Sequence, residues 1–238
     1  MSIGVIGGLG PMATAVFMKR VINMTDAAID QEHPDMIIYS APRIPDRTAY
    51  ILGKSTDSPL PHLLELAHKL EDQGSKVIAV PCITACYFNA DIKNEINVPV
   101  IHGVNGTADY LARNGIKKVG ILATEGSVKS GVIQNVLEKR GIEAIRPDAK
   151  TQELVTTLIF EQVKKGLPAD ISMLQEARDR MVAMGAEVCL LGCTDLSVIR
   201  EDCTNIGTGF FDILDMLAAQ SVQLSGHKVR DEYKYLLE

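Results

Sequence analysis

The stretch KVIAVPCITAC, residues 76–86, starts as an apolar run and ends in two cysteines on either side of a threonine. A second stretch, AEVCLLGCTDL at 186–196, has a similar arrangement. Short apolar runs of this kind are typical of fully buried strands. In both stretches the run stops at a cysteine with a threonine close behind it. Cys82 and Cys193 are therefore predicted to leave the ends of two similar strands, each just before a helix.

The same alternation of short apolar runs and longer amphipathic segments extends along the whole chain. Strands are predicted at 2–8, 35–42, 76–81, 98–103, 117–123, 143–147 and 187–192. Helices are predicted at 12–28, 59–73, 85–96, 106–114, 128–140, 152–165, 171–184 and 213–224. Strands that alternate with helices indicate parallel sheets covered by helices on both faces. The predicted fold class is therefore α/β.

A coarse internal duplication divides the chain into two lobes. IGVIGGLGP at 3–11 resembles KVGILATEGS at 118–127, and the order of elements repeats, although two apolar strands can also align by chance. We predict two pseudosymmetric lobes, each a mostly parallel sheet flanked by helices, formed by residues 1–102 with 208–238 and by residues 103–207. Ligands of open α/β sheets bind beyond the carboxyl ends of the strands. The shared cleft is thus expected to gather Gly7–Gly10, Cys82, Thr124 and Cys193.

Composition excludes several classes of protein. The 238 residues carry a net charge of −6, with no long run of Lys and Arg, so a nucleic-acid partner is not expected. No apolar run approaches the roughly 18 residues that span a bilayer, and MSIGVIGGLG lacks the features of a signal peptide. Five cysteines, an odd number, argue against a disulfide framework. A cytoplasmic protein with reduced thiols and no membrane partner is expected.

Two other sites are weighed and rejected. Gly8 and Gly10 in GGLGPMA follow a strand, as the glycines of a dinucleotide fingerprint do. However, the second predicted strand ends without the acidic residue that would bind the ribose. Pro11 also lacks the backbone N–H that a pyrophosphate would use at the start of the helix. The cysteines are also too far apart for zinc, because Cys189 and Cys193 lie roughly 13 Å apart along a strand. No metal and no cofactor are predicted.

Two thiols that face each other across a small cavity are able to invert a stereocentre. One thiolate removes a proton from carbon, and the opposite thiol donates a proton to the other face. Any single cysteine can instead be a buried residue that only fills the hydrophobic core. We predict this structural role for Cys189 and Cys203. The carbanion needs hydrogen-bond donors, which the hydroxyls of Thr84, Thr124 and Thr194 and the glycine-rich loop at Gly10 are expected to supply.

Several motifs together are similar to those of the aspartate/glutamate racemase family. These are GVIGGLGPMAT, RIPDRTAYI, PLPHLLELAHKLEDQGSKVIAVPCITA, GILAT and LLGCTDL, which occur in this order from Ile3 to about Leu214. The resemblance implies a racemase that works without pyridoxal phosphate, built from two α/β lobes and assembled as a homodimer. IPDRT resembles the aspartate branch, so an acidic amino acid is the expected partner, aspartate first and glutamate, or both, next.

The resemblance also implies roles for individual residues. Cys82 and Cys193 would be the catalytic pair, Cys82 on the D-face and Cys193 on the L-face of the α-carbon. Arg47 would bind the side-chain carboxylate of the substrate, a task that suits its planar fork. Lys164, in VKKG, resembles a second basic residue of the aspartate branch, the alternative being a solvated lysine at a helix end.

One departure from the family pattern affects the head group of the substrate. Pro-Cys-Asn-Thr-Ala-His is usual where this chain has Pro81-Cys82-Ile83-Thr84-Ala85-Cys86. Ile83 offers no hydrogen bond to the head group, and an unpaired buried polar group costs about 1–3 kcal/mol. Two alternatives to an active racemase therefore stay open: another cysteine enzyme on this scaffold, such as an isomerase or lyase of dicarboxylates, and a catalytically impaired amino-acid-binding protein.

Overall fold

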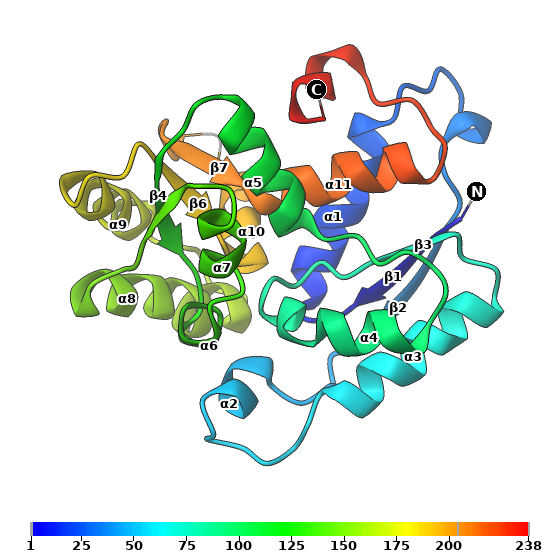
Figure 1. Cartoon of the computed structure of the whole chain (residues 1–238), viewed down its shortest axis with the longest axis horizontal. Helices are drawn as coiled ribbons and strands as arrows, with labels where there is room; N and C mark the ends of the chain where they lie inside the picture. The colour runs from blue at the N-terminus through cyan, green and yellow to red at the C-terminus, as the bar shows by residue number, and fades with distance from the viewer. Residues whose placement is uncertain (1, 204, 238) are drawn as a thin grey trace.

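Two separate parallel sheets form the centres of two lobes in the computed structural model, which describes residues 2–203 and 205–237 (Figure 1). The first sheet contains β1 (Ile3–Gly7), β2 (Met36–Ser40) and β3 (Val77–Ala79) in the order β2-β1-β3. The second contains β4 (Lys118–Leu122), β5 (Glu143–Ile145), β6 (Val188–Leu191) and β7 (Phe210–Asp212) in the order β5-β4-β6-β7. All pairs within the sheets are parallel, so the predicted fold class is confirmed.

The strand order of the first lobe recurs in the second. In each lobe the first strand lies at the centre, the second on one side and the third on the other, and β7 extends only the second sheet. The third strands are β3 and β6, and Cys82 and Cys193 follow them in the chain. The two thiols therefore leave equivalent strands of the two lobes.

Helices cover both faces of the first sheet because its strands are apolar on both sides. Val5 packs in one core cluster with Phe17 of α1 and Leu217 of α11. Ile6, which points to the opposite face, packs with Leu63 of α3. The helices of this lobe are α1 (Pro11–Met24), α3 (Leu60–Asp72), α4 (Asn89–Glu95) and α11 (Ile213–Leu224).

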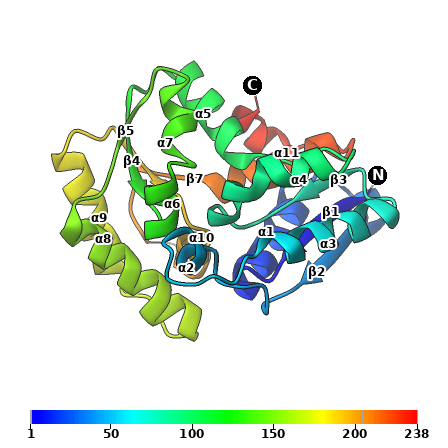
Figure 2. The same cartoon turned by 60° about the horizontal axis from the view of Figure 1, so that its bottom comes forward.

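The second sheet is covered in the same way. Leu191 packs with Leu158 and Met181 on one face, and Leu190 packs with Val104 and Leu137 on the other. The helices of this lobe are α5 (Gly103–Arg113), α6 (Glu125–Ser130), α7 (Gln134–Glu138), α8 (Ala149–Thr156), α9 (Ile171–Ala183) and α10 (Thr194–Asp202). Figure 2 shows α8 and α9 packed side by side along the outer edge of the lobe.

Short helical segments complete the chain. They are η1 (Asp30–Glu32), α2 (Arg47–Ile51), η2 (Thr84–Phe88), the π-helix η3 (Thr157–Gln162), η4 (Val163–Lys165) and η5 (Asp231–Leu236). Of these, α2 reaches from the first lobe to α6 of the second, where a Cβ on Gly126 would lie only 2.9 Å from the Cα of Thr48. Figure 2 shows α2 in this position between the lobes.

Several predicted elements differ in the structure, among them the helix predicted at 85–96, which begins as η2 and continues as α4. The strand predicted at 98–103 is reduced to a single bridge between Ile78 and Val100, because Pro99 has no N–H to donate to a ladder. The helix predicted at 128–140 is interrupted at Gly131, whose φ of 74° ends α6. The helix predicted at 152–165 keeps its helical course but changes to η3 at Thr157 and then to η4.

The chain passes between the lobes at two places that touch each other. It enters the second lobe at α5 and leaves β7 to enter α11, which packs against α1 of the first lobe. At the start of these helices, a Cβ on Gly103 would lie 3.1 Å from the Cβ of Leu217 and 3.3 Å from the carbonyl oxygen of Ile213. The predicted boundaries of the lobes stay a prediction, although β7, within 208–238, pairs with β6 of the second sheet.

The described helices do not include a candidate membrane span. None of those within 2–203 and 205–237 combines the length and the hydropathy that a membrane span requires.

Candidate active site

Cys82 lies three residues after the end of β3, where the chain turns sharply. Its backbone N–H donates to the carbonyl oxygen of Val80 at 2.7 Å, and its own carbonyl accepts from Ala85 N at 3.2 Å. The helical segment η2 begins two residues later, at Thr84. The side chain of Cys82 is buried, and it lines the cavity described below. The sharp turn therefore holds the thiol at the exit of the strand, as the sequence predicted.

Cys193 occupies the N-cap position of α10, two residues after the end of β6. Its carbonyl oxygen accepts from Leu196 N at 2.9 Å, and its thiol donates to Asp195 Oδ2 at 3.6 Å. Burial raises the pKa of the Cys193 thiol well above its ordinary value, and the negative charge of Asp195 raises it further. Lys164 opposes this shift only in part. The thiol form of Cys193 is thus favoured at neutral pH.

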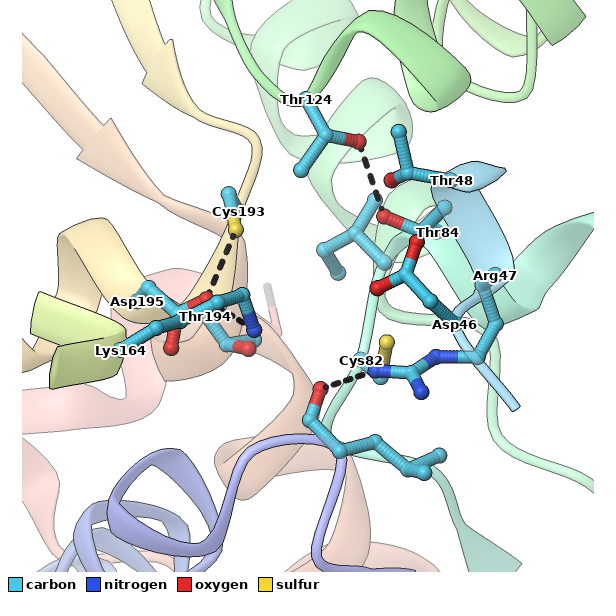
Figure 3. Close-up of a pocket in the computed structure, with 12 residues that line it drawn as sticks. Asp46, Arg47, Thr48, Cys82, Thr84, Thr124, Lys164, Cys193, Thr194 and Asp195 are labelled. Carbon is cyan, nitrogen blue, oxygen red and sulfur yellow. Dashed lines mark hydrogen bonds and ion pairs between the residues drawn. The ribbon is translucent and has the colours of Figure 1, made fainter. Parts of the chain in front are cut away.

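Both thiols line one small cavity between the lobes (Figure 3). Its volume is about 10 Å³, which is about the space of one water molecule. The lining comes from six segments of the chain: Leu9, Asp46, Arg47, Thr48, Cys82, Ile83, Thr84, Thr124, Lys164, Cys193, Thr194 and Asp195. The structure thereby brings together every site residue predicted from the sequence except Gly10.

Three hydroxyl groups form a closed triangle at the wall of this cavity. Thr84 Oγ1 lies 3.0 Å from Thr124 Oγ1 and 3.0 Å from Ser127 Oγ, and Thr124 and Ser127 are 3.1 Å apart. Thr124 also caps α6 by accepting from Ser127 N at 3.2 Å. Because Thr84 belongs to the first lobe and the other two to the second, the triangle links the lobes next to the thiols.

A second link joins the two cysteine loops directly. Thr194 Oγ1 donates to the carbonyl oxygen of Pro81 at 3.2 Å, and both groups are buried. Thr194 follows Cys193 and Pro81 precedes Cys82, so this bond connects the immediate neighbours of the two thiols. The hydroxyl of Thr194 is already engaged in this contact.

Arg47 reaches the cavity as the first residue of α2, where Asp46 caps the helix by accepting from Ala49 N at 2.6 Å. Its guanidinium donates to three carbonyl oxygens, those of Leu9 at 3.1 Å, Ile44 at 3.3 Å and Pro45 at 3.1 Å. Among the residues that the structure describes, the buried Nε of Arg47 has no partner. Most of the donor capacity of this arginine is therefore used to hold the loops around it.

Lys164 and Asp195 form an ion pair beside the cavity, with Nζ 3.0 Å from Oδ2. The lysine side chain is 27% exposed, whereas that of Asp195 is 6% exposed. Burial lowers the pKa of Lys164, but attraction to Asp195 and Cys193 outweighs this, so the pKa lies above its ordinary value. Asp195 thus contacts Cys193 and Lys164 through the same carboxylate oxygen.

Two other predicted positions have different surroundings. Gly10 caps α1 and lines an adjoining groove instead of the thiol cavity, and a Cβ there would lie 3.7 Å from Asp195 Oδ1. Ile83 is 2% exposed and packs in the core of the second lobe, so it borders the cavity with an apolar side chain. Cys86 lies beside Cys82, and burial raises its pKa to about 12, which keeps it protonated.

The adjoining groove is far larger, with a volume of about 910 Å³. Asp46, Arg47, Lys164 and Asp195 line both this groove and the thiol cavity. Beyond these charged residues the groove is bordered mostly by apolar side chains of the glycine-rich loop, the segment after η4 and α10. The thiol cavity therefore lies next to a large groove whose lining is mainly apolar.

Sequence reasoning did not select several residues of this site. Asp195 lies in the motif GCTDL, and Asp46 and Thr48 lie in RIPDRTAYI. Their position next to the predicted site residues Cys193 and Arg47 could have indicated that they belong to the site. For Ser127, the sequence indicates only that it lies three residues after Thr124, a spacing typical of a helix cap. Among the described residues, no group of three or more His, Cys, Asp or Glu side chains has an arrangement that would hold a metal ion.

Comparisons with known proteins identify the family of this chain. Residues 6–220 match the family described as Asp/Glu/hydantoin racemase. The chain is similar to the broad specificity amino-acid racemase RacX of Bacillus subtilis (strain 168), with 30% identity over 209 residues that cover 84% of this chain and 87% of that protein. It is 28% identical to the glutamate racemase of Aquifex pyrophilus over 193 residues, 78% of this chain and 71% of that protein.

Among solved structures, Picrophilus torridus aspartate racemase is similar over 99% of this chain and 98% of that chain, with a TM-score of 0.83 and 30% identity. An aspartate racemase homologue from Pyrococcus horikoshii OT3 shares the fold over 94% of this chain and 99% of that chain, with a TM-score of 0.74 and 24% identity. The chain therefore belongs to the Asp/Glu/hydantoin racemase family and is an amino-acid racemase, an isomerase.

Proposed function

We propose that this racemase interconverts L- and D-aspartate without a cofactor, with Cys82 and Cys193 as its two bases. The observation that carries the proposal is the position of the thiols: each follows an equivalent strand of its lobe, and both line one cavity of about 10 Å³. Similarity to an aspartate racemase over nearly the whole chain favours aspartate as the substrate.

The reaction requires one ionised and one protonated thiol. In the D-to-L direction the thiolate of Cys82 takes the α-proton, and the thiol of Cys193 gives its proton to the opposite face of the carbanion. The enzyme is left with a Cys82 thiol and a Cys193 thiolate, the form that acts on L-aspartate. The raised pKa of Cys193 suits its role as the initial acid in the D-to-L direction.

Asp195 holds the Cys193 thiol in place and keeps it protonated, and Lys164 limits this effect by neutralising the carboxylate. A thiol that donates to a carboxylate 3.6 Å away has a fixed direction. Its proton must leave that contact in order to reach the substrate. Asp195 is therefore a positioning residue, which acts through Cys193.

Hydrogen-bond donors that could stabilise the carbanion are present in the site, but most of them already donate to other protein groups. Negative charge on the substrate carboxylate grows as the α-proton leaves, and hydroxyl or N–H donors stabilise it. Thr84 and Thr124 can turn their protons from the hydroxyl triangle toward the substrate, since a hydroxyl rotates to suit its acceptor. Arg47 and Lys164 are the cations available to the two carboxylates of aspartate, Arg47 through its remaining donor capacity and Lys164 after it releases Asp195.

Proton NMR of L-aspartate and of L-glutamate in D₂O, each with the purified enzyme and no added cofactor, tests this proposal. Loss of the α-proton signal together with appearance of the D-enantiomer is expected for aspartate. Cys82→Ala and Cys193→Ala should each abolish racemisation, whereas Cys189→Ala, in a cysteine buried in the second core, should retain it. Unchanged racemisation in both single variants would exclude the two-thiol mechanism.

Glutamate, or activity on both acidic amino acids, is the second candidate, because glutamate racemases are also among the relatives. An alkene or keto product would instead indicate a different cysteine isomerase or lyase. Thermal stabilisation by aspartate without deuterium exchange would indicate an impaired binding protein, the outcome that Ile83 and Cys86 would explain. A homodimer and a cytoplasmic location stay predictions from the resemblance.

A further inference from the structure

The groove beside the thiol cavity is built to receive more than aspartate needs. It adjoins the thiol cavity at Asp46, Arg47, Lys164 and Asp195, which line both spaces. Its volume of about 910 Å³ lies within the range of small-molecule sites, whereas the thiol cavity has about 10 Å³. The groove is therefore the large space into which a side chain attached to an α-carbon between the thiols can extend past these charged residues.

The charges at this opening cancel. Arg47 and Lys164 supply two positive charges, and Asp46 and Asp195 supply two negative charges. Lys164 is paired with Asp195 at 3.0 Å, and Arg47 donates to the carbonyl oxygens of Leu9, Ile44 and Pro45. A side-chain carboxylate has to compete with these partners, whereas an uncharged side chain adds no such competition to that of the α-carboxylate.

Beyond the opening the walls are apolar. They are formed by Pro11, Met12, Pro42, Ile44, Val163, Leu167, Pro168, Ala169, Val198, Ile199 and Cys203, with Asp202 as the one further charged residue of this lining. Met12 belongs to α1 and Leu167 follows η4, and they are 60% and 54% exposed, so apolar surface is available to a ligand. Each buried CH₂ group contributes about 0.8 kcal/mol of favourable transfer free energy.

We infer that this groove is a side-chain subsite for uncharged, apolar amino acids of the size of methionine or leucine. This inference rests on the proposed two-thiol function and extends its substrate range beyond the acidic amino acids. The ammonium and carboxylate groups of the ligand remain at the charged opening, its α-carbon lies between Cys82 and Cys193, and its side chain lies against Met12 and Leu167. The chemical step is the same proton exchange, so no further reactant is required.

Deuterium exchange at the α-carbon of methionine, leucine, alanine and aspartate, measured separately by proton NMR in D₂O, tests the inference. Methionine and leucine should exchange, with kcat/KM at least about tenfold above that of alanine, whose side chain is too short to reach the groove. Exchange of aspartate alone, or equal rates for alanine and methionine, would overturn the subsite and leave the racemase intact. No exchange with any amino acid would instead overturn the proposed function together with the subsite.

Variants of the groove give a second readout. Leu167→Asn and Met12→Asn each replace an exposed apolar wall by an amide, and each should lower kcat/KM for methionine about tenfold while changing that for aspartate less than about twofold. Leu224→Asn is the matched control, because Leu224 is 52% exposed on α11 and does not line the groove. Equal effects of Leu167→Asn and Leu224→Asn on methionine would contradict the subsite.

Discussion

The hydroxyl of Thr194 donates to the carbonyl oxygen of Pro81 at 3.2 Å, so the residue after Cys193 is bonded to the residue before Cys82. Because the two residues belong to different lobes, this bond helps to set the separation of the two thiols. In a two-base reaction the substrate carbon must lie within reach of both sulfur atoms at once. Under the proposed two-thiol mechanism, the Thr194–Pro81 contact therefore contributes to the geometry that the reaction needs.

Replacement of Thr194 by valine should weaken the site without changing its volume much. The Pro81 carbonyl loses its donor, which should lower the free energy of unfolding by about 1–2 kcal/mol. A small change in the separation of the thiols should lower kcat/KM for aspartate by about 10- to 100-fold. Kinetics and denaturant unfolding of Thr194→Val and Thr194→Ser would check this, since the serine variant keeps the hydroxyl. Equal losses in both variants would contradict the role of the hydroxyl, because only the valine variant loses it.

The pH dependence of racemisation should follow the ionisation of the thiol pair. One of the two thiols must be a thiolate, and burial and Asp195 raise the pKa of Cys193. We therefore expect kcat/KM to rise from pH 6 to pH 9. The profile should be the same for both enantiomers, because their equilibrium constant is one. Initial rates by circular dichroism across this range would measure it, and a flat profile would contradict it.

Two substitutions should move this profile in opposite directions. Asp195→Asn removes the negative charge that raises the pKa of Cys193, so the ascending part should move to lower pH. Lys164→Met removes a positive charge that lowers the same pKa, so the ascending part should move to higher pH. A general loss of structure would lower rates in both variants without opposite shifts.

A buried cluster of charges behind the site should contribute strongly to stability. Arg20 of α1 pairs with Asp212 at 2.7 Å and with Asp215 at 2.6 Å. Because both Arg20 and Asp212 are buried, Arg20→Met should lower the free energy of unfolding by about 3–5 kcal/mol. Lys19→Met is the control: Lys19 is 61% exposed in its pair with Glu201, and its loss should cost at most about 1 kcal/mol. Denaturant unfolding of both variants would distinguish these values.

Acid should destabilise the folded chain partly through His102. Burial lowers the pKa of His102 to about 4, below its ordinary value of 6.5. Between these two values the unfolded chain binds a proton that the folded chain does not, so stability should fall as the pH falls from 6.5 to 4. The shift of this one group corresponds to about 3 kcal/mol. Thermal unfolding of His102→Gln should show a smaller loss over the same range than the unaltered chain.

The parts of the fold that could be predicted from sequence were those with a local signal. The apolar runs at β3 and β6 predicted their strands, and the cysteines that follow them lie where the runs end. By contrast, β7 was not predicted. Its residues Phe210–Asp212 continue directly into the apolar sequence of α11, so the change from strand to helix periodicity is not visible. Pro99 reduced a predicted strand to one bridge, an effect that the apolar pattern alone does not reveal.

The candidate site divides in the same way. Cys82, Cys193, Arg47 and Thr84 were accessible through motifs, whereas the pairing of Lys164 with Asp195 depends on how η4 packs against α10. The role of Ile83 could not be judged from the sequence, since its side chain both borders the cavity and fills the second core. Long-range contacts of this kind depend on the whole fold.

The close approach of Gly103 to Ile213 has a consequence for turnover. The thiol cavity holds about one water molecule, so an amino acid cannot reach it unless the lobes separate. The chain crosses between the lobes only beside these two residues, within the parts that the structure describes. Rotation about this single hinge would open the cavity and break the Thr194–Pro81 bond while leaving both sheets whole. The rate of that opening would then set an upper limit on the rate of racemisation.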